Sequence, residues 1–211
     1  MIQTFNEIVK SFAKTIPDFL FVVIGANDGM TGDPIYPFIK EYGWKGVLVE
    51  PQKNRFDELV RNFAGQDGLA FENAAIAETP GTVILNTCGE LGMGSSLMPD
   101  EYFLEVKPQA FANRQACGGT VPVKVDAITL DDLLYKHKMA KVDLFSIDVE
   151  GYDFNIIKMI NFEHYKPSLI NYESDKLGKQ KQLCERLLRA YGYQFHYHGL
   201  DTLAYLISPE D

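Results

Sequence analysis

Acidic residues end two apolar segments in the second half of the chain. Asp148 and Glu150 alternate at the end of a predicted strand over residues 142–149, and Glu173 ends a predicted strand over 169–173. Neighbouring parallel strands lie about 4.8 Å apart, so these three side chains can converge at one sheet edge. Helix capping would also explain them. Because carboxylates that share a buried site repel each other, the sequence favours an acid–base site at Asp148, Glu150 and Glu173.

A glycine-containing turn near the N-terminus indicates a nucleotide site. Residues 21–33, "FVVIGANDGMTGD", run from an apolar strand into a turn that contains Gly25 and Gly29. Glycine lets backbone N–H groups approach a ligand at the carboxyl edge of a parallel sheet. The G-x-G-x-x-G fingerprint is incomplete, since Asn27 replaces its second glycine. Glu50, 25 residues after Gly25, can accept both hydroxyls of a ribose. These features fit NAD and S-adenosylmethionine equally well.

Strands and helices alternate along the chain in a way that predicts a Rossmann-like α/β fold with a mostly parallel sheet and helices on both faces. The last segment, "YQFHYHGLDTLAYLIS", predicts an antiparallel hairpin around its Gly-Leu-Asp turn. This combination is similar to the architecture of class I S-adenosylmethionine-dependent methyltransferases. The predicted parallel strands are residues 19–25, 45–50, 69–76, 142–149 and 169–173, and the helices are 34–42, 54–63, 129–137, 154–160 and 179–191.

The remaining segments are predicted to belong to the same single domain, which covers residues 1–211. Residues 1–17 predict an amphipathic helix that ends before Pro17. Further strands are predicted at 81–88 and 121–125. Between them, residues 89–119 are rich in glycine and predict an irregular insertion with a weak helical patch at 102–111. Long irregular segments in compact domains are often functional, so we expect a substrate lid there.

Composition excludes several classes of protein. The formal net charge is −9 and no extended basic patch is visible, so we expect no nucleic-acid partner. Three widely spaced cysteines argue against a disulfide framework or a zinc ribbon, and they indicate a reducing, cytoplasmic location. No apolar run approaches the roughly 20 residues of a membrane span. The sequence leaves the oligomeric state open, with a homodimer among the options.

Several motifs together carry a family resemblance. In order along residues 19–173 they read "FVVIGANDG", "GVLVEP", "FENAAIAETPGTVIL", "GSSL", "ITLDDLL" and "VDLFSIDVEGYD". This series resembles the FkbM-type methyltransferases, a branch of the class I S-adenosylmethionine-dependent enzymes. The resemblance implies O-methylation of a hydroxyl on a sugar, a glycan or natural-product precursor, or another small molecule.

The resemblance also implies roles for single residues. One departure from the family concerns the position two residues before Gly25, which is usually acidic and is Val23 here. Asp28 or Asp148 must then contact the methionine ammonium of the cofactor. The implied roles are: Gly25, Ala26, Asn27 and Gly29 around the cofactor, Glu50 on the ribose, Pro51, Asn73, Ala74 and Ala75 near the adenine, Ser95 and Ser96 near the substrate, and Asp148 beside the methyl group.

Methyl transfer to a hydroxyl gains from a base that removes the proton, and Asp148 is favoured over Glu150 and Glu173 for its place at a strand end. His196 and His198 in the hairpin are weaker candidates. The carboxylates would also suit a divalent metal, which we consider without favouring it. The alternatives are an NAD-dependent nucleotide-sugar oxidoreductase or epimerase, a non-catalytic S-adenosylmethionine-binding module, and an RNA methyltransferase, which the negative charge disfavours.

Overall fold

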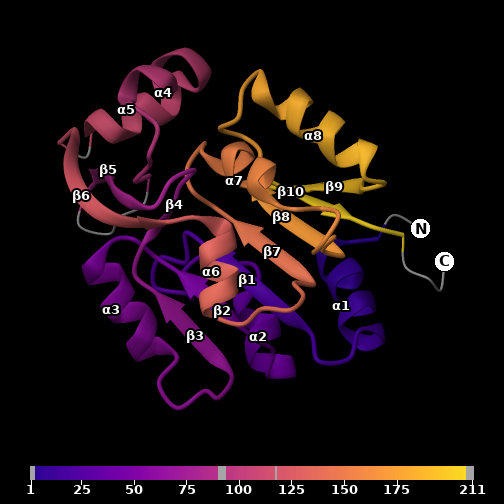
Figure 1. Cartoon of the computed structure of the whole chain (residues 1–211). Coiled ribbons are helices and arrows are strands. Elements are labelled where there is room, and N and C mark those ends of the chain that lie inside the picture. Colours follow the sequence, from indigo (N-terminus) through magenta and orange to yellow (C-terminus); the bar gives the residue numbers. More distant parts are fainter. Residues whose placement is uncertain (1–2, 90–93, 117, 208–211) are drawn as a thin grey trace.

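The computed structural model describes residues 3–89, 94–116 and 118–207, and its central feature is a seven-stranded sheet (Figure 1). The strand order is β3-β2-β1-β7-β8-β10-β9. The first five of these strands are parallel, and β10 and β9 form an antiparallel hairpin on β8. The predicted architecture is therefore confirmed. The strands are β1 Leu20–Ile24, β2 Lys45–Val49, β3 Leu69–Glu72, β7 Leu144–Ile147, β8 Leu169–Glu173, β9 Gln194–His198 and β10 Asp201–Tyr205.

Alternation along the strands places a hydrophobic core on each face of the sheet. In β1, Phe21 and Val23 pack into one core, while Val22 and Ile24 pack into the other. The first core is covered by α1 Phe5–Thr15, α2 Tyr36–Tyr42 and α3 Lys53–Asn62. The second is covered by α6 Leu130–Lys136, α7 Asp153–Met159 and α8 Gln180–Ala190. Both faces of a mostly parallel sheet are buried in this way, as its apolar strands require.

The N-terminal helix α1 ends before Pro17, as the sequence predicts, and it begins at Phe5 with Thr4 as its N-cap. Thr4 and Glu7 form a capping box: the Thr4 hydroxyl accepts from the Glu7 amide, and Glu7 accepts from the Thr4 amide at 2.7 Å. Ile8, Val9 and Phe12 form its buried stripe. In the part of the chain that the structure describes, no helix is both long enough and apolar enough to cross a bilayer.

A second sheet corrects one prediction. Residues 69–76 do not form one strand, because β3 ends at Glu72 and the chain then enters β4, Ala75–Ile76, in a three-stranded sheet of order β4-β6-β5. The physical cause is Asn73, whose side-chain amide donates to the Glu50 carbonyl at 2.8 Å and to the Pro51 carbonyl at 3.1 Å. The predicted strand 81–88 is confirmed as β5 Gly81–Cys88, whereas β6 Thr120–Ile128 extends beyond the predicted 121–125.

The predicted irregular segment 89–119 contains two helices, α4 Asp100–Val106 and α5 Pro108–Ala116. The helical patch predicted at 102–111 is confirmed, and helix extends beyond it on both sides (residues 90–93 and 117 lie outside the described part). Arg114 joins the helices: its guanidinium lies 4.3 Å from the Phe103 ring centroid, and its Nε donates to Asp100 at 2.9 Å. This buried arginine gives an otherwise polar segment its own small core. Figure 1 shows α4 and α5 beside β5 and β6.

Candidate active site

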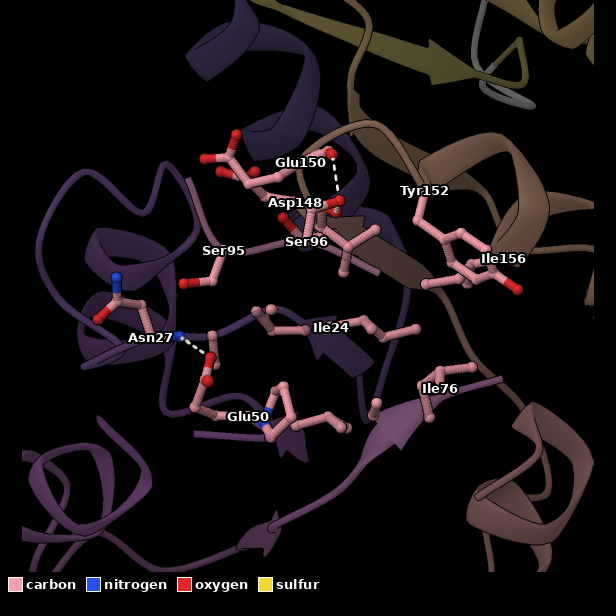
Figure 2. A pocket seen from close by; sticks show the side chains of 18 of the residues that line it. Ile24, Asn27, Glu50, Ile76, Ser95, Ser96, Asp148, Glu150, Tyr152 and Ile156 are labelled. Atoms are coloured by element: carbon pink, nitrogen blue, oxygen red, sulfur yellow. Dashed lines mark hydrogen bonds between the residues drawn. The ribbon is translucent and has the colours of Figure 1, made fainter. Parts of the chain in front are cut away.

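A pocket opens at the carboxyl ends of β1, β2 and β7, the edge where ligands bind in open α/β sheets. Residues 25–27, 50–52 and 148–150, which follow these strands, line it together with β4 and residues 94–97. In Figure 2, Asn27 and Glu50 lie on one side, and Ser95, Ser96, Asp148 and Glu150 lie on another. Ile24, Ile76, Tyr152 and Ile156 form an apolar wall, so one pocket offers both polar and apolar surfaces.

The glycine turn is shaped by contact between β1 and the end of β7. Gly25 has φ +84°, and a Cβ atom there would lie 1.8 Å from the Asp148 carbonyl oxygen. Glycine is required at this position for both reasons. Gly29, with φ +74°, has a different role, because a Cβ there would meet Leu59 and Phe63 of the α3 region. Gly25 thus lines the pocket, whereas Gly29 lets the turn pack on a helix.

Glu50 is fixed in the pocket wall by backbone hydrogen bonds. It is 3% exposed, and its two carboxylate oxygens accept from the amides of Asn27 at 2.9 Å and Gln52 at 2.8 Å. Burial raises the pKa of Glu50, and these hydrogen bonds oppose the rise. A carboxylate held in this way can still accept hydrogen bonds from hydroxyl groups with its remaining lone pairs.

Asp148, Glu150 and Glu173 do converge: each offers a carboxylate oxygen, and these three oxygens lie within 4.8 Å of one another. One detail of the prediction is wrong, since β7 ends at Ile147 and the pair does not alternate along a strand. Glu150 has φ +57° and Gly151 has φ +92°, so a tight turn brings Glu150 back over the strand end. Glu173, at the end of β8, is 4% exposed and lies behind the pocket wall.

Lys176 joins this cluster and was not singled out from the sequence. Its Nζ lies 2.8 Å from Glu173 Oε1 and also pairs with Glu150 Oε2. The side chain is 15% exposed. In the sequence, the only sign of this ion pair is that Lys176 stands three residues after Glu173. That spacing predicts an ion pair in a helix but not in a loop whose backbone geometry is unknown.

Glu150 connects residues 94–96 to the site through hydrogen bonds. Its Oε1 accepts from the Gly94 amide at 3.1 Å while Oε2 binds Lys176, so both oxygens are engaged. Its carbonyl accepts from the Ser96 hydroxyl at 2.7 Å. Ser95 and Ser96 thereby line the pocket, where the family resemblance places them. Of the three carboxylates, Asp148 presents its side chain to the pocket without these ties to the segment.

The cluster raises the proton affinity of its members. The pKa of Asp148 rises to about 7, because protein encloses it on the sides away from the pocket water and because the negative charge of Glu150 lies close. The pKa of Glu173 rises to about 8, owing first to burial and then to the charges of Glu150 and Asp148. The Lys176 ammonium opposes both shifts. Asp148 is thus poised to exchange a proton near neutral pH.

Other predicted residues divide between the pocket and its supports. Ala26, Asn27, Pro51, Ala74 and Ala75 line the pocket, as does Val23. Three predicted cofactor residues, Asp28, Gly29 and Asn73, do not line it, since Asp28 accepts from the amides of Met30 and Thr31 within its own turn. His196 and His198 also lie outside the lining, and the His198 ring bonds to Asn171 Oδ1 at 2.9 Å.

The pocket also contains residues to which the sequence analysis assigned no role. Asp33 follows the glycine turn, Asp201 begins β10, and Tyr152 and Ile156 come from the start of α7. With Glu50, Asp148 and Glu150, the lining holds five carboxylates, and none of the described lining residues is lysine, arginine or histidine. The pocket therefore favours a cationic or neutral ligand over an anionic one.

Comparisons with known proteins agree with this geometry. The family model described as "Methyltransferase FkbM domain" matches residues 24–195. A curated relative, Methyltransferase sdnD of Sordaria araneosa, is 28% identical over 168 residues, which are 72% of this chain and 64% of that protein. The chain thus spans less than two thirds of that relative.

Two solved structures share the fold at low identity. The FkbM methyltransferase from Methylobacillus flagellatus KT has a TM-score of 0.56 at 14% identity, over 90% of this chain and 44% of that one. The METTL16 methyltransferase domain has a TM-score of 0.50 at 11% identity, over 99% and 70%. Since the family model spans most of the sequence and the structural likeness supports the class I fold, the chain belongs to the FkbM methyltransferase domain family.

Proposed function

We propose that this chain transfers a methyl group from S-adenosylmethionine to a hydroxyl of a neutral small molecule, such as a sugar or a natural-product precursor. The observation that carries the proposal is the position of Glu50 and Asp148 on two sides of one pocket, at the ends of β2 and β7. Glu50 suits a ribose, and Asp148 suits a proton that leaves an acceptor oxygen.

The residues present fit the cofactor. The backbone of residues 25–27 and the Glu50 carboxylate would hold its ribose and amino-acid parts, and the apolar wall of Ile76, Tyr152 and Ile156 beside Pro51 would receive the adenine. When bound, the cofactor supplies an electrophilic methyl group on a positively charged sulfur. A pocket lined by carboxylates stabilises that charge, whereas it repels the pyrophosphate of NAD.

The chain's own residues then have separate roles. Ser95 and Ser96 lie across the pocket from Glu50 and can orient an acceptor hydroxyl, a contribution that reaches roughly 7–11 kcal/mol when positioning is ideal. Asp148 can accept the hydroxyl proton, which adds on the order of 10²–10⁴-fold. Of the two residues expected to compensate for Val23, Asp148 lines the pocket and Asp28 does not.

The experiment is calorimetry with S-adenosylmethionine and with NAD, followed by a screen for S-adenosylhomocysteine release with neutral sugars, polyols and phenols and with their phosphorylated forms. We expect tight binding of S-adenosylmethionine only, and turnover with a neutral acceptor only. Binding of NAD instead would refute the proposal. Binding of S-adenosylmethionine with no turnover on any acceptor class would favour the non-catalytic alternative.

A further inference from the structure

Lys176 is held in a fixed place by contacts of its loop with α4 and with the residue that follows α4. Its backbone carbonyl accepts from the Tyr102 hydroxyl of α4 at 2.7 Å. The preceding residue, Asp175, pairs with Lys107 between α4 and α5. These contacts fix the loop after β8 at two adjacent positions. The Lys176 ammonium therefore stays between Glu150 and Glu173 while α4 is packed.

The surroundings of this ammonium have the composition of a site for a hard cation. Asp148, Glu150 and Glu173 bring three oxygens within 4.8 Å of one another, and carboxylate oxygens are the preferred ligands of Mg²⁺ and Mn²⁺. Glu173 is 4% exposed, and its Oε2 has no hydrogen-bond partner among the described residues. One lysine thus lies beside three carboxylates, and one buried oxygen, Glu173 Oε2, can still accept from a positively charged group.

We infer that the Lys176 ammonium is the built-in cation of this centre and takes the place that a divalent metal would otherwise fill. Its Nζ lies between the carboxylates of Glu150 and Glu173 and pairs with both. Lys176 is a positioning residue, because it acts through the carboxylates and does not line the pocket. The inference concerns cation binding and does not rest on the proposed function.

One consequence can be measured directly. Removing the ammonium while keeping the aliphatic stem, as in Lys176→Met, leaves three carboxylates at a spacing that suits a divalent ion, so the variant should acquire a metal site. We expect Mn²⁺, titrated into the full chain and followed by calorimetry and electron paramagnetic resonance, to bind Lys176→Met at least about tenfold more tightly than the unmodified protein. Adding Glu173→Gln to that variant should abolish the gain.

The matched control is Lys107→Met, which removes a neighbouring ion pair with Asp175 but leaves the three carboxylates unchanged. It should bind Mn²⁺ as weakly as the unmodified protein. Methyl transfer by the unmodified protein should survive EDTA. Turnover by Lys176→Met should be slow in EDTA and partly restored by Mn²⁺, a response that a merely structural lysine would not produce.

Two results would overturn the inference. One is stoichiometric Mn²⁺ binding by the unmodified protein that Glu173→Gln abolishes, because the ammonium would then not be the resident cation. The other is a folded Lys176→Met or Lys176→Gln variant that binds Mn²⁺ no more tightly than the unmodified protein. If neither variant folds, stoichiometric Mn²⁺ binding by the unmodified protein that Glu173→Gln abolishes would still overturn the inference. No Mn²⁺ titration requires S-adenosylmethionine, so failure of the proposed function would appear separately, as lack of cofactor binding.

Discussion

Replacing Asp148 with asparagine should stabilise the protein while it slows turnover. A carboxylate oxygen of Asp148 lies within 4.8 Å of one from Glu150 and one from Glu173. For a side chain open to pocket water, an effective dielectric of about 40–80 gives roughly 1–2 kcal/mol of repulsion for each pair. Attraction to Lys176 cancels about one of these two terms. The variant should therefore gain about 1 kcal/mol of unfolding free energy when all the groups are charged, or roughly 2–4 °C in Tm.

The pH dependence of this gain has a definite sign. The pKa of Asp148 in the folded protein is raised to about 7, above the value of about 3.9 expected in the unfolded chain. The folded state therefore binds more protons than the unfolded state between these values, and the contribution of Asp148 to stability falls as pH rises through that window. Asparagine does not titrate. The stabilisation by Asp148→Asn should be near zero at pH 4 and should approach its full value only above about pH 8, because the pKa of Glu173 also rises, to about 8.

Urea unfolding of the unmodified protein and Asp148→Asn at pH 5, 6, 7 and 8 measures this difference. Asp126→Asn, which removes an exposed carboxylate on β6, is the control and should show no such trend. If Asp148→Asn is no more stable than the unmodified protein at pH 8, the proposed repulsion between Asp148 and its neighbouring carboxylates is refuted. In the same samples, methyl transfer by the unmodified protein should rise through about pH 7 and fall on the order of 10²–10⁴-fold in the variant.

Three further predictions test the pocket and the segment that contains α4 and α5. Gly25→Ala should cost at least about 3 kcal/mol of unfolding free energy, because the added Cβ meets a backbone carbonyl. Gly65→Ala, at a glycine with similar φ and open space around it, should cost about 1 kcal/mol. Equal losses would contradict the close approach of β1 and β7. Glu50→Gln should weaken S-adenosylmethionine binding about 10–100-fold by calorimetry with the fold retained, and unchanged affinity would exclude Glu50 as the ribose acceptor. Tyr102→Phe should lower kcat and leave cofactor affinity intact if α4 and α5 form a substrate lid, with the exposed Tyr135→Phe as control; loss of cofactor binding would argue against a lid.

Much of the site could be predicted because its residues follow strands. Apolar runs with glycine turns and a terminal hairpin indicated a mostly parallel sheet, and the carboxyl ends of such strands must meet at one edge. Glu50 and Asp148 directly follow β2 and β7, so their place in one pocket follows from the order of elements. Gly25 has φ +84° and a Cβ there would meet the Asp148 carbonyl oxygen, so its place in the turn is explained only once β1 and the end of β7 lie side by side.

The tertiary structure decided what periodicity does not encode. Asn73 breaks an apparently continuous strand because its amide finds backbone carbonyls at the end of β2, a long-range contact that no local pattern shows. Lys176 reaches Glu150 across 26 residues of sequence only because α4 holds its loop in place. Hydrophobic patterning thus indicates most of the strands but not all of their ends, because contacts such as those of Asn73 are long-range. Packing between loops decides which charges meet, because their positions depend on contacts made after the sheet has formed.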